Sequence, residues 1–449
     1  MAISRRDALK LTTVLATSTA ISGCATTQSS QSITKDVKEE NNKAPLPDKK
    51  NTRVVIVGGG WSGLSVAKNL KHFSPKTEVI LVEQKDQFIS CPMSNLWLVD
   101  KVSLEYLTHD YLQAARKNNY IFFQATATGM DKKNNILHTT KGDIEYDYIL
   151  FAPGIDYDYS FLTQDLELEN RLKQEYPAGF KPGSEHLTLK NKIHNFKEGN
   201  FLMTVPAGNY RCLPAPYERA CLVADFFKSK NLNAKVVLLD ENNDITIKEK
   251  GFHSAFEELY SDYLEYYPNS KIEYIDLDEK FVETEFEEFN FDDASFYPRV
   301  RGAKILEKVG IAKDTVFNRL EANINGLTYQ AIGYENIFVS GDARPMGFSK
   351  SGNTASTEGF FVATLIADRI NEVKNTPWQS PTTLCFSAVS MSPERAIFVN
   401  SMYAYNEKKK RFGFATPKTS EAWKGKEGLT NAKAQHDWAN AIYRYMFGD

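Results

Sequence analysis

Apolar and polar positions along the chain form two repeats of strand, helix and strand. The first repeat begins with the apolar, β-branched run Arg53–Val57, continues through a helical segment over residues 64–73 and ends in a second apolar run over residues 78–82. Short continuous apolar runs of this kind are typical of parallel strands that are buried on both faces of a sheet. The first repeat is therefore predicted to form a Rossmann-like unit.

The second repeat follows a polar stretch over residues 156–200, which we interpret as a surface excursion. Its apolar runs cover residues 201–205 and 235–239, and a helix is predicted between them over residues 217–229. From residue 377 the pattern changes to short strands and aromatic-rich segments. We therefore predict an α/β fold with two Rossmann-like, dinucleotide-binding-type domains plus a C-terminal α+β domain.

A glycine motif joins the first predicted strand to its helix. Gly58, Gly60 and Gly63 form a G-x-G-x-x-G turn, and the second strand ends at Glu83. Glycines in this setting let the backbone approach a pyrophosphate at the helix N-terminus, and the acid accepts hydrogen bonds from ribose hydroxyls. The motif alone is weak evidence. Because both strands and the acid stand in register with it, a dinucleotide site is predicted here.

The corresponding turn of the second repeat has a different composition. Residues 206–216 contain one glycine and three prolines, and proline lacks the N–H group that would face a phosphate. A second dinucleotide is therefore not expected. The turn instead carries Cys212 just before a helix, whose dipole stabilises a thiolate, and Glu218 follows in the first helical turn. Two interpretations stay open for each residue: Cys212 is reactive or a buried structural thiol, and Glu218 transfers a proton or only complements the dipole.

The beginning of the chain is typical of an export signal. Over residues 1–24, a twin-arginine pattern at Arg5 and Arg6 precedes a mild apolar run and a lipoprotein-box-like end at Cys24. The alternative is an ordinary cleavage site, in which case Cys24 carries no lipid. Residues 25–52 contain almost no large apolar side chains and are predicted to form a disordered tether. We therefore expect a periplasmic protein, exported by the twin-arginine route, with a lipid at Cys24 as its only candidate membrane attachment.

Composition excludes several classes of function. The formal net charge is −3 and no basic patch is present, so nucleic acid is not an expected partner. No apolar run of 18 residues follows the signal, so no membrane-spanning helix is expected. Five cysteines are too few for a disulfide scaffold in a chain of 449 residues, and no metal site is predicted.

The order and wording of these motifs resemble the flavoprotein subunit of flavocytochrome c sulfide dehydrogenase, from about Arg53 to the C-terminus. The most specific part is the stretch over residues 210–220, Tyr-Arg-Cys-Leu-Pro-Ala-Pro-Tyr-Glu-Arg-Ala. The resemblance implies an FAD cofactor, with Cys212 as one half of a redox-active disulfide and Glu218 as a proton-transfer residue. It also implies a thioether between FAD and Cys91, which lies in the loop over residues 88–95.

The resemblance extends to two further turns. Gly154 follows a buried strand, as in the turn that closes the first domain of two-dinucleotide-domain flavoproteins. Gly341 and Asp342 end a later strand, ahead of a helix predicted from about residue 356. In similar flavoproteins this aspartate accepts hydrogen bonds from the ribityl chain. The expected cofactor-binding residues are therefore Gly58, Gly60, Gly63, Glu83, Cys91, Gly154, Gly341 and Asp342.

The chain departs from the family pattern at the second redox cysteine. That cysteine is expected in a loop corresponding to residues 312–320, where Asn318 stands instead, and no cysteine occurs between Cys221 and Cys385. Cys212 is therefore predicted to lack a partner. Cys221 is predicted to be a packed thiol and Cys385 a structural one.

The resemblance implies an exported FAD-dependent oxidoreductase that passes electrons from sulfide or another small sulfur compound to a c-type cytochrome or similar acceptor. One alternative is a quinone-linked sulfide oxidoreductase. Another is a flavin electron-transfer protein that has lost sulfide oxidation along with its second cysteine. The expected domains are residues 53–155 with 310–375 for FAD binding, residues 156–309 without a nicotinamide phosphate loop, and residues 376–449 as a C-terminal interface domain.

Overall fold

The computed structural model describes residues 42–448. The expected signal, with Cys24, and most of the expected tether lie outside these residues. Residues 42–52 do not behave as a tether: the Ala44 N–H donates to the Asp143 carbonyl at 2.9 Å, and Ala44 is buried. This segment lies against a small antiparallel layer because Ala44 and its neighbour Leu46 join the apolar cluster beneath that layer.

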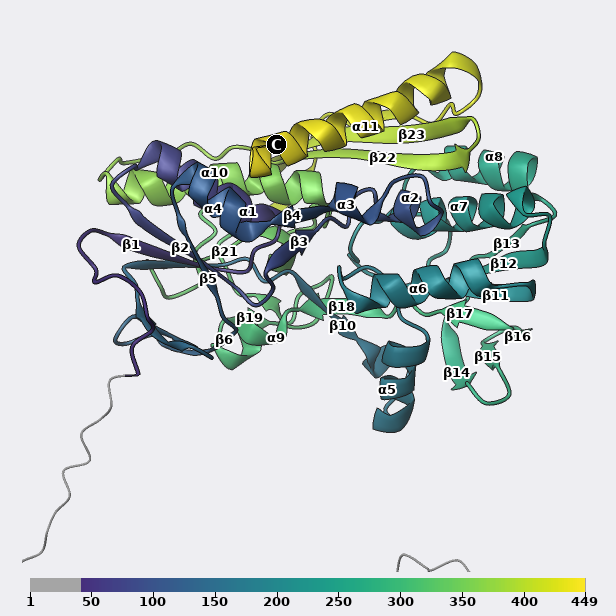
Figure 1. The fold of residues 1–449 in the computed structure, drawn as a ribbon, viewed down its shortest axis with the longest axis horizontal. Helices are drawn as coiled ribbons and strands as arrows, with labels where there is room; N and C mark the ends of the chain where they lie inside the picture. Colours follow the sequence, from purple (N-terminus) through teal and green to yellow (C-terminus); the bar gives the residue numbers. More distant parts are fainter. Residues whose placement is uncertain (1–41, 449) are drawn as a thin grey trace, which may run out of the picture. The chain divides into compact units, whose positions relative to one another are not determined.

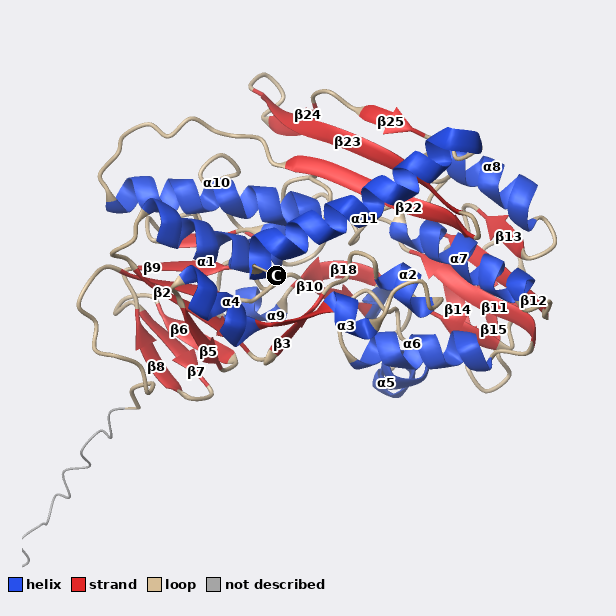
Figure 2. Ribbon diagram, turned by 45° about the horizontal axis from the view of Figure 1, so that its top comes forward, coloured by secondary structure: helices blue, strands red, loops and turns tan. Residues whose placement is uncertain are grey.

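A five-stranded parallel sheet forms the first domain, with the strand order β21-β9-β1-β2-β5 (Figure 1). The strands are β1 (Arg53–Val57), β2 (Glu78–Glu83), β5 (Ile121–Gln124), β9 (Tyr148–Phe151) and β21 (Ile337–Val339). Helices α1 (Trp61–Phe73) and α10 (Gly352–Ile370) pack against each other along this sheet (Figure 2). Because β21 pairs with β9, the segment that carries Gly341 and Asp342 returns to the domain that carries the glycine turn.

Shorter elements surround this sheet. They are β3 (Gln87–Ile89), α2 (Ser94–Leu98), α3 (Leu104–Leu107), β4 (Thr108–Asp110), α4 (Tyr111–Asn118), and the antiparallel layer of β6 (Ala127–Asp131), β7 (Ile136–Thr139) and β8 (Gly142–Glu145). The pair β3–β4 holds the loop that carries Cys91, since β3 ends two residues before it.

The second domain contains a parallel sheet with the order β13-β12-β11-β17. Its elements are β11 (Glu198–Val205), α7 (Ala215–Ser229), β12 (Asn233–Asp240), α8 (Glu249–Tyr260), β13 (Leu264–Tyr267) and β17 (Asp293–Ser295). The stretch interpreted as a surface excursion contains two helices, α5 (Leu166–Glu175) and α6 (Ser184–Asn195). The sequence did not indicate them because their polar faces dominate: α5 buries only Leu172.

The remaining elements of the central region connect the two domains or extend the second one. They are β10 (Ile155–Asp158), which pairs antiparallel with β18 (Arg299–Gly302), the sheet of β14 (Ile272–Asp276), β15 (Phe281–Thr284) and β16 (Glu288–Asn290), then α9 (Lys304–Lys308), β19 (Ala312–Lys313) and β20 (Glu321–Ala322).

The C-terminal region adds an antiparallel sheet and a long helix. The strands are β22 (Thr382–Met391), β23 (Glu394–Asn406), β24 (Arg411–Phe414) and β25 (Lys418–Ser420), and the helix is α11 (Gly425–Phe447). Helix α11 lies along β22 and β23 (Figure 1), while β22 also packs against α7 of the second domain. These contacts confirm the predicted fold class. Within residues 42–448, no helix is both long enough and apolar enough to cross a bilayer.

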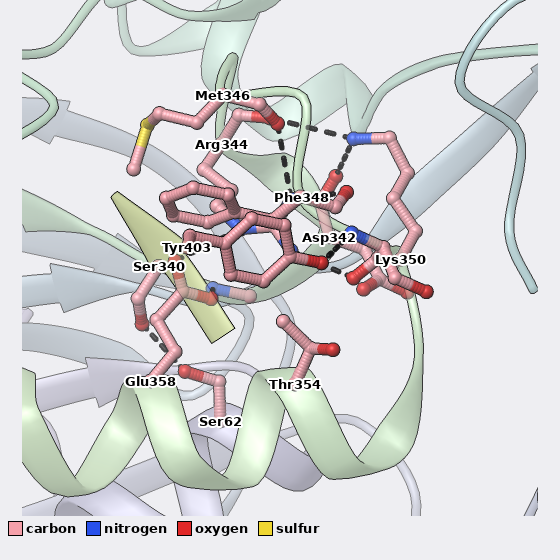
Figure 3. A network of polar contacts seen from close by, with 12 residues as sticks. Ser62, Ser340, Asp342, Arg344, Met346, Phe348, Lys350, Thr354, Glu358 and Tyr403 are labelled. Carbon is pink, nitrogen blue, oxygen red and sulfur yellow. Dashed lines mark hydrogen bonds and ion pairs between the residues drawn. The ribbon is translucent and has the colours of Figure 1, made fainter. Parts of the chain in front are cut away.

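A buried ion pair supports the segment that follows β21 (Figure 3). The Arg344 guanidinium lies 2.9 Å from the Glu358 carboxylate, and neither side chain is exposed to solvent. Arg344 also donates to the Ser349 carbonyl at 2.8 Å, and Glu358 accepts from the Gly341 N–H at 2.9 Å. The pair thereby ties residues 341–349 to α10.

We predict that Arg344→Met lowers the free energy of unfolding by about 3–5 kcal/mol, because it leaves the Glu358 carboxylate buried without its cation. Chemical denaturation followed by circular dichroism measures the change. Arg369→Met, at an exposed arginine on α10, the helix that carries Glu358, is the control and should cost under about 1 kcal/mol. Equal losses in the two variants would contradict this account of the ion pair.

Candidate functional site

The glycine turn forms a backbone cradle at the start of α1. Gly58 has a φ of +107°, a conformation that favours glycine, and a Cβ on Gly63 would lie 1.9 Å from the Gly58 carbonyl oxygen. Helix α1 begins after Gly60 without a side-chain cap. Its first backbone N–H groups are therefore available to an anion, as the sequence predicts for a pyrophosphate.

A cavity of about 420 Å³ extends from this turn. Its walls include seven of the predicted cofactor-binding residues: Gly58, Gly60, Glu83, Cys91, Gly154, Gly341 and Asp342. Gly63 does not line the cavity, since it supports the turn from below by close packing against Gly58. Glu83 accepts a hydrogen bond from the Gly59 N–H at 2.8 Å, which places its carboxylate beside the turn.

The carboxylate of Asp342 indicates whether the cavity suits FAD. Its Oδ1 atom is buried and has no hydrogen-bond partner among the described residues, while its Oδ2 atom lies 3.3 Å from Nε of Arg211. A buried carboxylate oxygen without a donor is costly, so it calls for a ligand hydroxyl. Together with the uncapped helix and the size of the cavity, this oxygen fits a flavin dinucleotide.

A second, smaller cavity of about 70 Å³ adjoins the first, with room for a few water-sized molecules. Cys91, Arg211, Ser351 and Gly352 line both cavities. The small cavity is also lined by Cys212, Glu218 and Cys385, so three of the chain's cysteines and the predicted proton carrier meet at one place.

Cys212 sits in a constrained backbone conformation. Its φ of 56° lies in the left-handed region, which is uncommon for a residue other than glycine. The Cys212 N–H donates to the Lys350 carbonyl at 2.8 Å, and the Tyr297 hydroxyl donates to the Arg211 carbonyl at 3.0 Å. These two hydrogen bonds hold the backbone of the proline-rich turn at Arg211 and Cys212 from two sides.

The expectation that Cys212 lacks a partner was wrong. The thiol of Cys385, from β22, lies in the same small cavity as the thiol of Cys212, close enough for a mutual hydrogen bond to shift the pKa of both. Cys385 reaches this position because β22 packs against α7, whose N-terminus follows Cys212. Asn318, where the partner was sought, donates instead to the Asn209 carbonyl and to Glu321, at 3.0 and 2.9 Å.

The two thiols are electrostatically unequal. Their mutual hydrogen bond is the largest influence on both, and it raises the pKa of Cys212 and lowers the pKa of Cys385. Burial and the nearby Glu218 carboxylate raise both pKa values, while the Lys248 ammonium lowers them. The thiolate of the pair is therefore favoured at Cys385.

Glu218 is buried in the first turn of α7, where it is held by three donors. The Asn95 amide donates to Oε2 at 2.9 Å, and the Ala388 N–H and the Gln435 amide donate to Oε1 at 2.8 and 3.4 Å. Burial raises the pKa of Glu218, and these hydrogen bonds oppose the increase. A carboxyl group with a raised pKa beside two thiols is suited to proton transfer.

Asn95 and Arg219 also belong to this site, and sequence reasoning did not assign them a role. Nε of Arg219 donates to Asn95 Oδ1 at 3.0 Å, and the guanidinium stacks on Phe180 at 3.9 Å. Arg219 thereby fixes the amide that donates to Glu218. The sequence signal for these residues was the pattern Tyr-Glu-Arg-Ala after Pro216. A Glu–Arg pair that is buried at the start of a helix needs polar partners nearby.

Cys91 lies between the two cavities. Its thiol donates to the Phe180 carbonyl at 3.3 Å, and its pKa is raised by burial, although the guanidinium groups of Arg211 and Arg219 act in the opposite direction. This position beside the dinucleotide cavity agrees with the expected loop near the cofactor.

Cys221 and a cluster of acidic residues with a histidine lie outside the two cavities. Cys221 is fully buried and does not line either cavity, as expected for a packed thiol. Asp244, Glu249 and His253 bring their ligand atoms within 4.8 Å of one another at the start of α8, so the expectation of no metal site stays a prediction.

Three family models match the chain. They are the central part of the sulfide dehydrogenase [flavocytochrome c] flavoprotein chain over residues 186–297, pyridine nucleotide-disulphide oxidoreductase over residues 52–175, and the flavin-binding part of flavocytochrome c sulphide dehydrogenase over residues 379–447.

Individual relatives agree with these matches. The sulfide dehydrogenase [flavocytochrome c] flavoprotein chain of Chlorobaculum thiosulfatiphilum is 54% identical over 43 residues, which is 10% of this chain and 90% of that one. The mitochondrial sulfide:quinone oxidoreductase of Dictyostelium discoideum is 28% identical over 42% of this chain and 41% of its own, so less than half of that relative is spanned.

A solved structure shares the fold. The sulfide:quinone oxidoreductase of Aquifex aeolicus has a TM-score of 0.71 at 16% identity, covering 89% of this chain and 92% of that one. From these matches it follows that the chain belongs to the family of the flavocytochrome c sulfide dehydrogenase flavoprotein chain.

Proposed function

We propose that this protein oxidises sulfide, or another small sulfur compound, at a Cys212–Cys385 disulfide and passes the electrons through FAD to a c-type cytochrome or similar acceptor. The observation that carries the proposal is the contact of the two thiols in a small cavity that shares four residues with the dinucleotide cavity. A disulfide at this place would adjoin the cavity that is proposed to hold the cofactor.

The proposed steps balance in atoms and electrons. Hydrosulfide attacks one cysteine sulfur, the bond between Cys212 and Cys385 breaks, and a cysteine persulfide and a thiolate form. A second hydrosulfide removes the outer sulfur as hydrodisulfide and leaves a thiol and a thiolate. Bound FAD would supply the two-electron acceptor that is needed as the disulfide re-forms, and one-electron transfer to the final acceptor. Two hydrosulfide ions thereby give one hydrodisulfide ion, one proton and two electrons.

Glu218 is the proposed acceptor of that proton. It is the buried carboxylate that lines the cysteine cavity, and its donors from Asn95 and Ala388 orient both oxygens. Arg219 acts through Asn95 as a positioning residue.

Arg211 and Lys350 are proposed to hold the cofactor side of the site. Arg211 lines both cavities beside Asp342. Lys350 is buried, with its ammonium 2.6 Å from the Asp342 carbonyl (Figure 3). The same ammonium lies 2.8 Å from the Glu321 carboxylate. Each cation is paired with a carboxylate, Arg211 with Asp342 and Lys350 with Glu321, and the two pairs would fix this segment beside a bound flavin.

The acceptor and the location are proposed on separate grounds. Two of the matching family models and the Chlorobaculum thiosulfatiphilum relative are named for flavocytochrome c, which favours a cytochrome acceptor. The twin-arginine pattern at Arg5 and Arg6 and the lipoprotein-box-like end at Cys24 favour export to the periplasm, with a lipid anchor as the candidate attachment.

A quinone acceptor is the second candidate function. A groove of about 430 Å³ lies on the far side of Asn353 and Trp438, which also line the cysteine cavity, and Phe360, Phe361 and Ile442 give it an apolar wall. Two assays separate the acceptors. The protein is first reduced anaerobically by sulfide, and the rate at which it then reduces cytochrome c is compared with the rate at which it reduces a soluble quinone.

We predict that Cys385→Ala abolishes the bleaching of the flavin by stoichiometric sulfide, because the disulfide that accepts the substrate cannot form. Anaerobic titration followed at the flavin absorbance band measures the effect. Cys221→Ala removes a buried thiol outside the cavity and is the matched control, which should bleach as the wild type does. Sulfide-dependent bleaching in Cys385→Ala would refute the proposed route.

Glu218→Gln is expected to slow flavin reduction by sulfide by about 10²–10⁴-fold and to remove one pH-dependent limb. The carboxylate that accepts the proton exists above the pKa of Glu218 and is lost as the pH falls through it. Because burial raises that pKa, the acid limb in the wild type should lie at a higher pH than for an ordinary carboxyl group. Stopped-flow rates across pH test this. Asp225→Asn, on the same helix outside the cavity, is the control and should keep the acid limb of the rate profile. An acid limb that persists in Glu218→Gln would exclude Glu218 as the proton acceptor.

Covalent attachment of FAD through Cys91 is also proposed, and acid precipitation tests it. The wild-type pellet is expected to stay yellow, whereas Cys91→Ser should release its flavin to the supernatant and retain the same visible absorbance before acid treatment. A yellow supernatant from the wild type would show that the flavin dissociates and would remove Cys91 as the point of attachment.

A further inference from the structure

Lys248 is a buried lysine whose ammonium contacts the backbone of Cys385. Only 3% of it is exposed, and its φ of 57° places it in the left-handed region just before α8. A buried lysine needs specific partners, and a left-handed backbone at a residue other than glycine persists only where the surrounding structure enforces it. Both features indicate that the surrounding structure holds this ammonium at a specific position.

The partners of the Lys248 ammonium belong to the strand that carries Cys385. Nζ donates to the Ser387 hydroxyl at 2.6 Å and to the carbonyl of Cys385 itself at 3.3 Å. Lys248 is not among the residues that line the cysteine cavity. It therefore acts on the chemistry through the groups around it, and Cys385 is the one whose carbonyl it contacts.

The groups that face Lys248 come from four elements. They are Cys385 on β22, Cys212 in the proline-rich turn, Glu218 on α7, and Glu421 in the segment before α11. Glu421 also accepts from the Gly251 N–H at 2.9 Å, which commits part of its charge to the first turn of α8. Among these groups Cys385 has the largest electrostatic interaction with the ammonium, and its carbonyl also accepts a hydrogen bond from it.

We propose that Lys248 is a positioning cation that makes Cys385 the thiolate of the pair and thereby directs sulfide to Cys212. The inference rests on the proposed function and deepens it. In a disulfide the sulfur that leaves faster is the one whose thiolate is more stable. Hydrosulfide accordingly attacks Sγ of Cys212, the Cys212–Cys385 bond breaks, a sulfur–sulfur bond to Cys212 forms with its proton retained, and Cys385 leaves as a thiolate beside Lys248.

The pKa values of the groups agree with this direction. Cys385 has a lowered pKa, for which its hydrogen bond with Cys212 is the main cause and Lys248 a further one, whereas Cys212 has a raised pKa. Burial lowers the pKa of Lys248 itself. Its charge, and with it the preference for Cys385, is therefore lost at a lower pH than for an exposed lysine.

Alkylation of the reduced protein tests the inference without sulfide or turnover. Anaerobic pulses of iodoacetamide across pH, read cysteine by cysteine by mass spectrometry, should give Cys385 a lower apparent pKa than Cys212. In Lys248→Met the apparent pKa of Cys385 should rise by about one unit or more, which is a tenfold loss of thiolate. The equilibrium with glutathione should shift by about tenfold in the same variant, which equals about 30 mV for a two-electron couple.

Three further variants separate charge from folding. Lys248→Arg keeps the charge and should restore most of the shift, and Lys250→Met, at an exposed lysine on α8, should alkylate as the wild type does. Ser387→Ala removes the hydroxyl that accepts from the ammonium and should give a smaller shift in the same direction, which keeps the test decisive if Lys248→Met does not fold.

Two outcomes would overturn the inference: an unchanged Cys385 profile in Lys248→Met and Ser387→Ala, or a persulfide found on Cys385 after one equivalent of sulfide. A wild-type flavin that sulfide does not bleach would instead refute the proposed function, and the alkylation result would stand apart from it.

Discussion

The contact between the thiols of Cys212 and Cys385 depends on how one helix packs against one strand. Helix α7 begins directly after the proline-rich turn, and β22 from the C-terminal sheet lies against that helix. Any displacement of the C-terminal sheet would separate the thiols, however well each domain folded alone. The hydrogen bond from Cys212 to the Lys350 carbonyl adds a third fixed point, from the segment that also carries Asp342. Two cavities and a sulfur pair are thus aligned by backbone contacts among three parts of the chain.

Buried charge is the second feature of the site. Glu218, Arg219 and Lys248 are all largely removed from water, and isolated charges in such surroundings would be prohibitively costly. Each instead has specific partners: Asn95 connects Arg219 to Glu218, and Ser387 accepts from Lys248. Partnered charges in a low-dielectric site act strongly on their neighbours, which is how the protein can assign different protonation to two chemically identical thiols.

The first domain and its glycine turn were predictable from the sequence because the signals are local. The apolar run Arg53–Val57, the spacing of Gly58, Gly60 and Gly63, and the acid at Glu83 all lie within one strand–helix–strand unit. The second unit was equally visible from its two apolar runs. The helices α5 and α6 were missed because a short helix with few buried residues leaves little apolar periodicity.

The cysteine pair could not be predicted in the same way. Cys385 lies in an ordinary-looking strand, Thr-Thr-Leu-Cys-Phe-Ser, and its partner lies far away along the chain. Only the packing of β22 on α7 reveals that they meet, and the same packing brings the Ala388 N–H to Glu218. Long-range contacts of this kind carry no signature in local composition, whereas the turn, the helix dipole and the position of Glu218 do.

Peptide mapping of the oxidised protein under non-reducing conditions tests the central claim most directly. If the two thiols form the reactive pair, proteolysis followed by mass spectrometry will give a cross-linked peptide that joins Cys212 to Cys385, and reduction will release both peptides. An oxidised protein in which Cys212 and Cys385 are both recovered as free thiols, or in which Cys212 is joined to a different cysteine, would contradict the account.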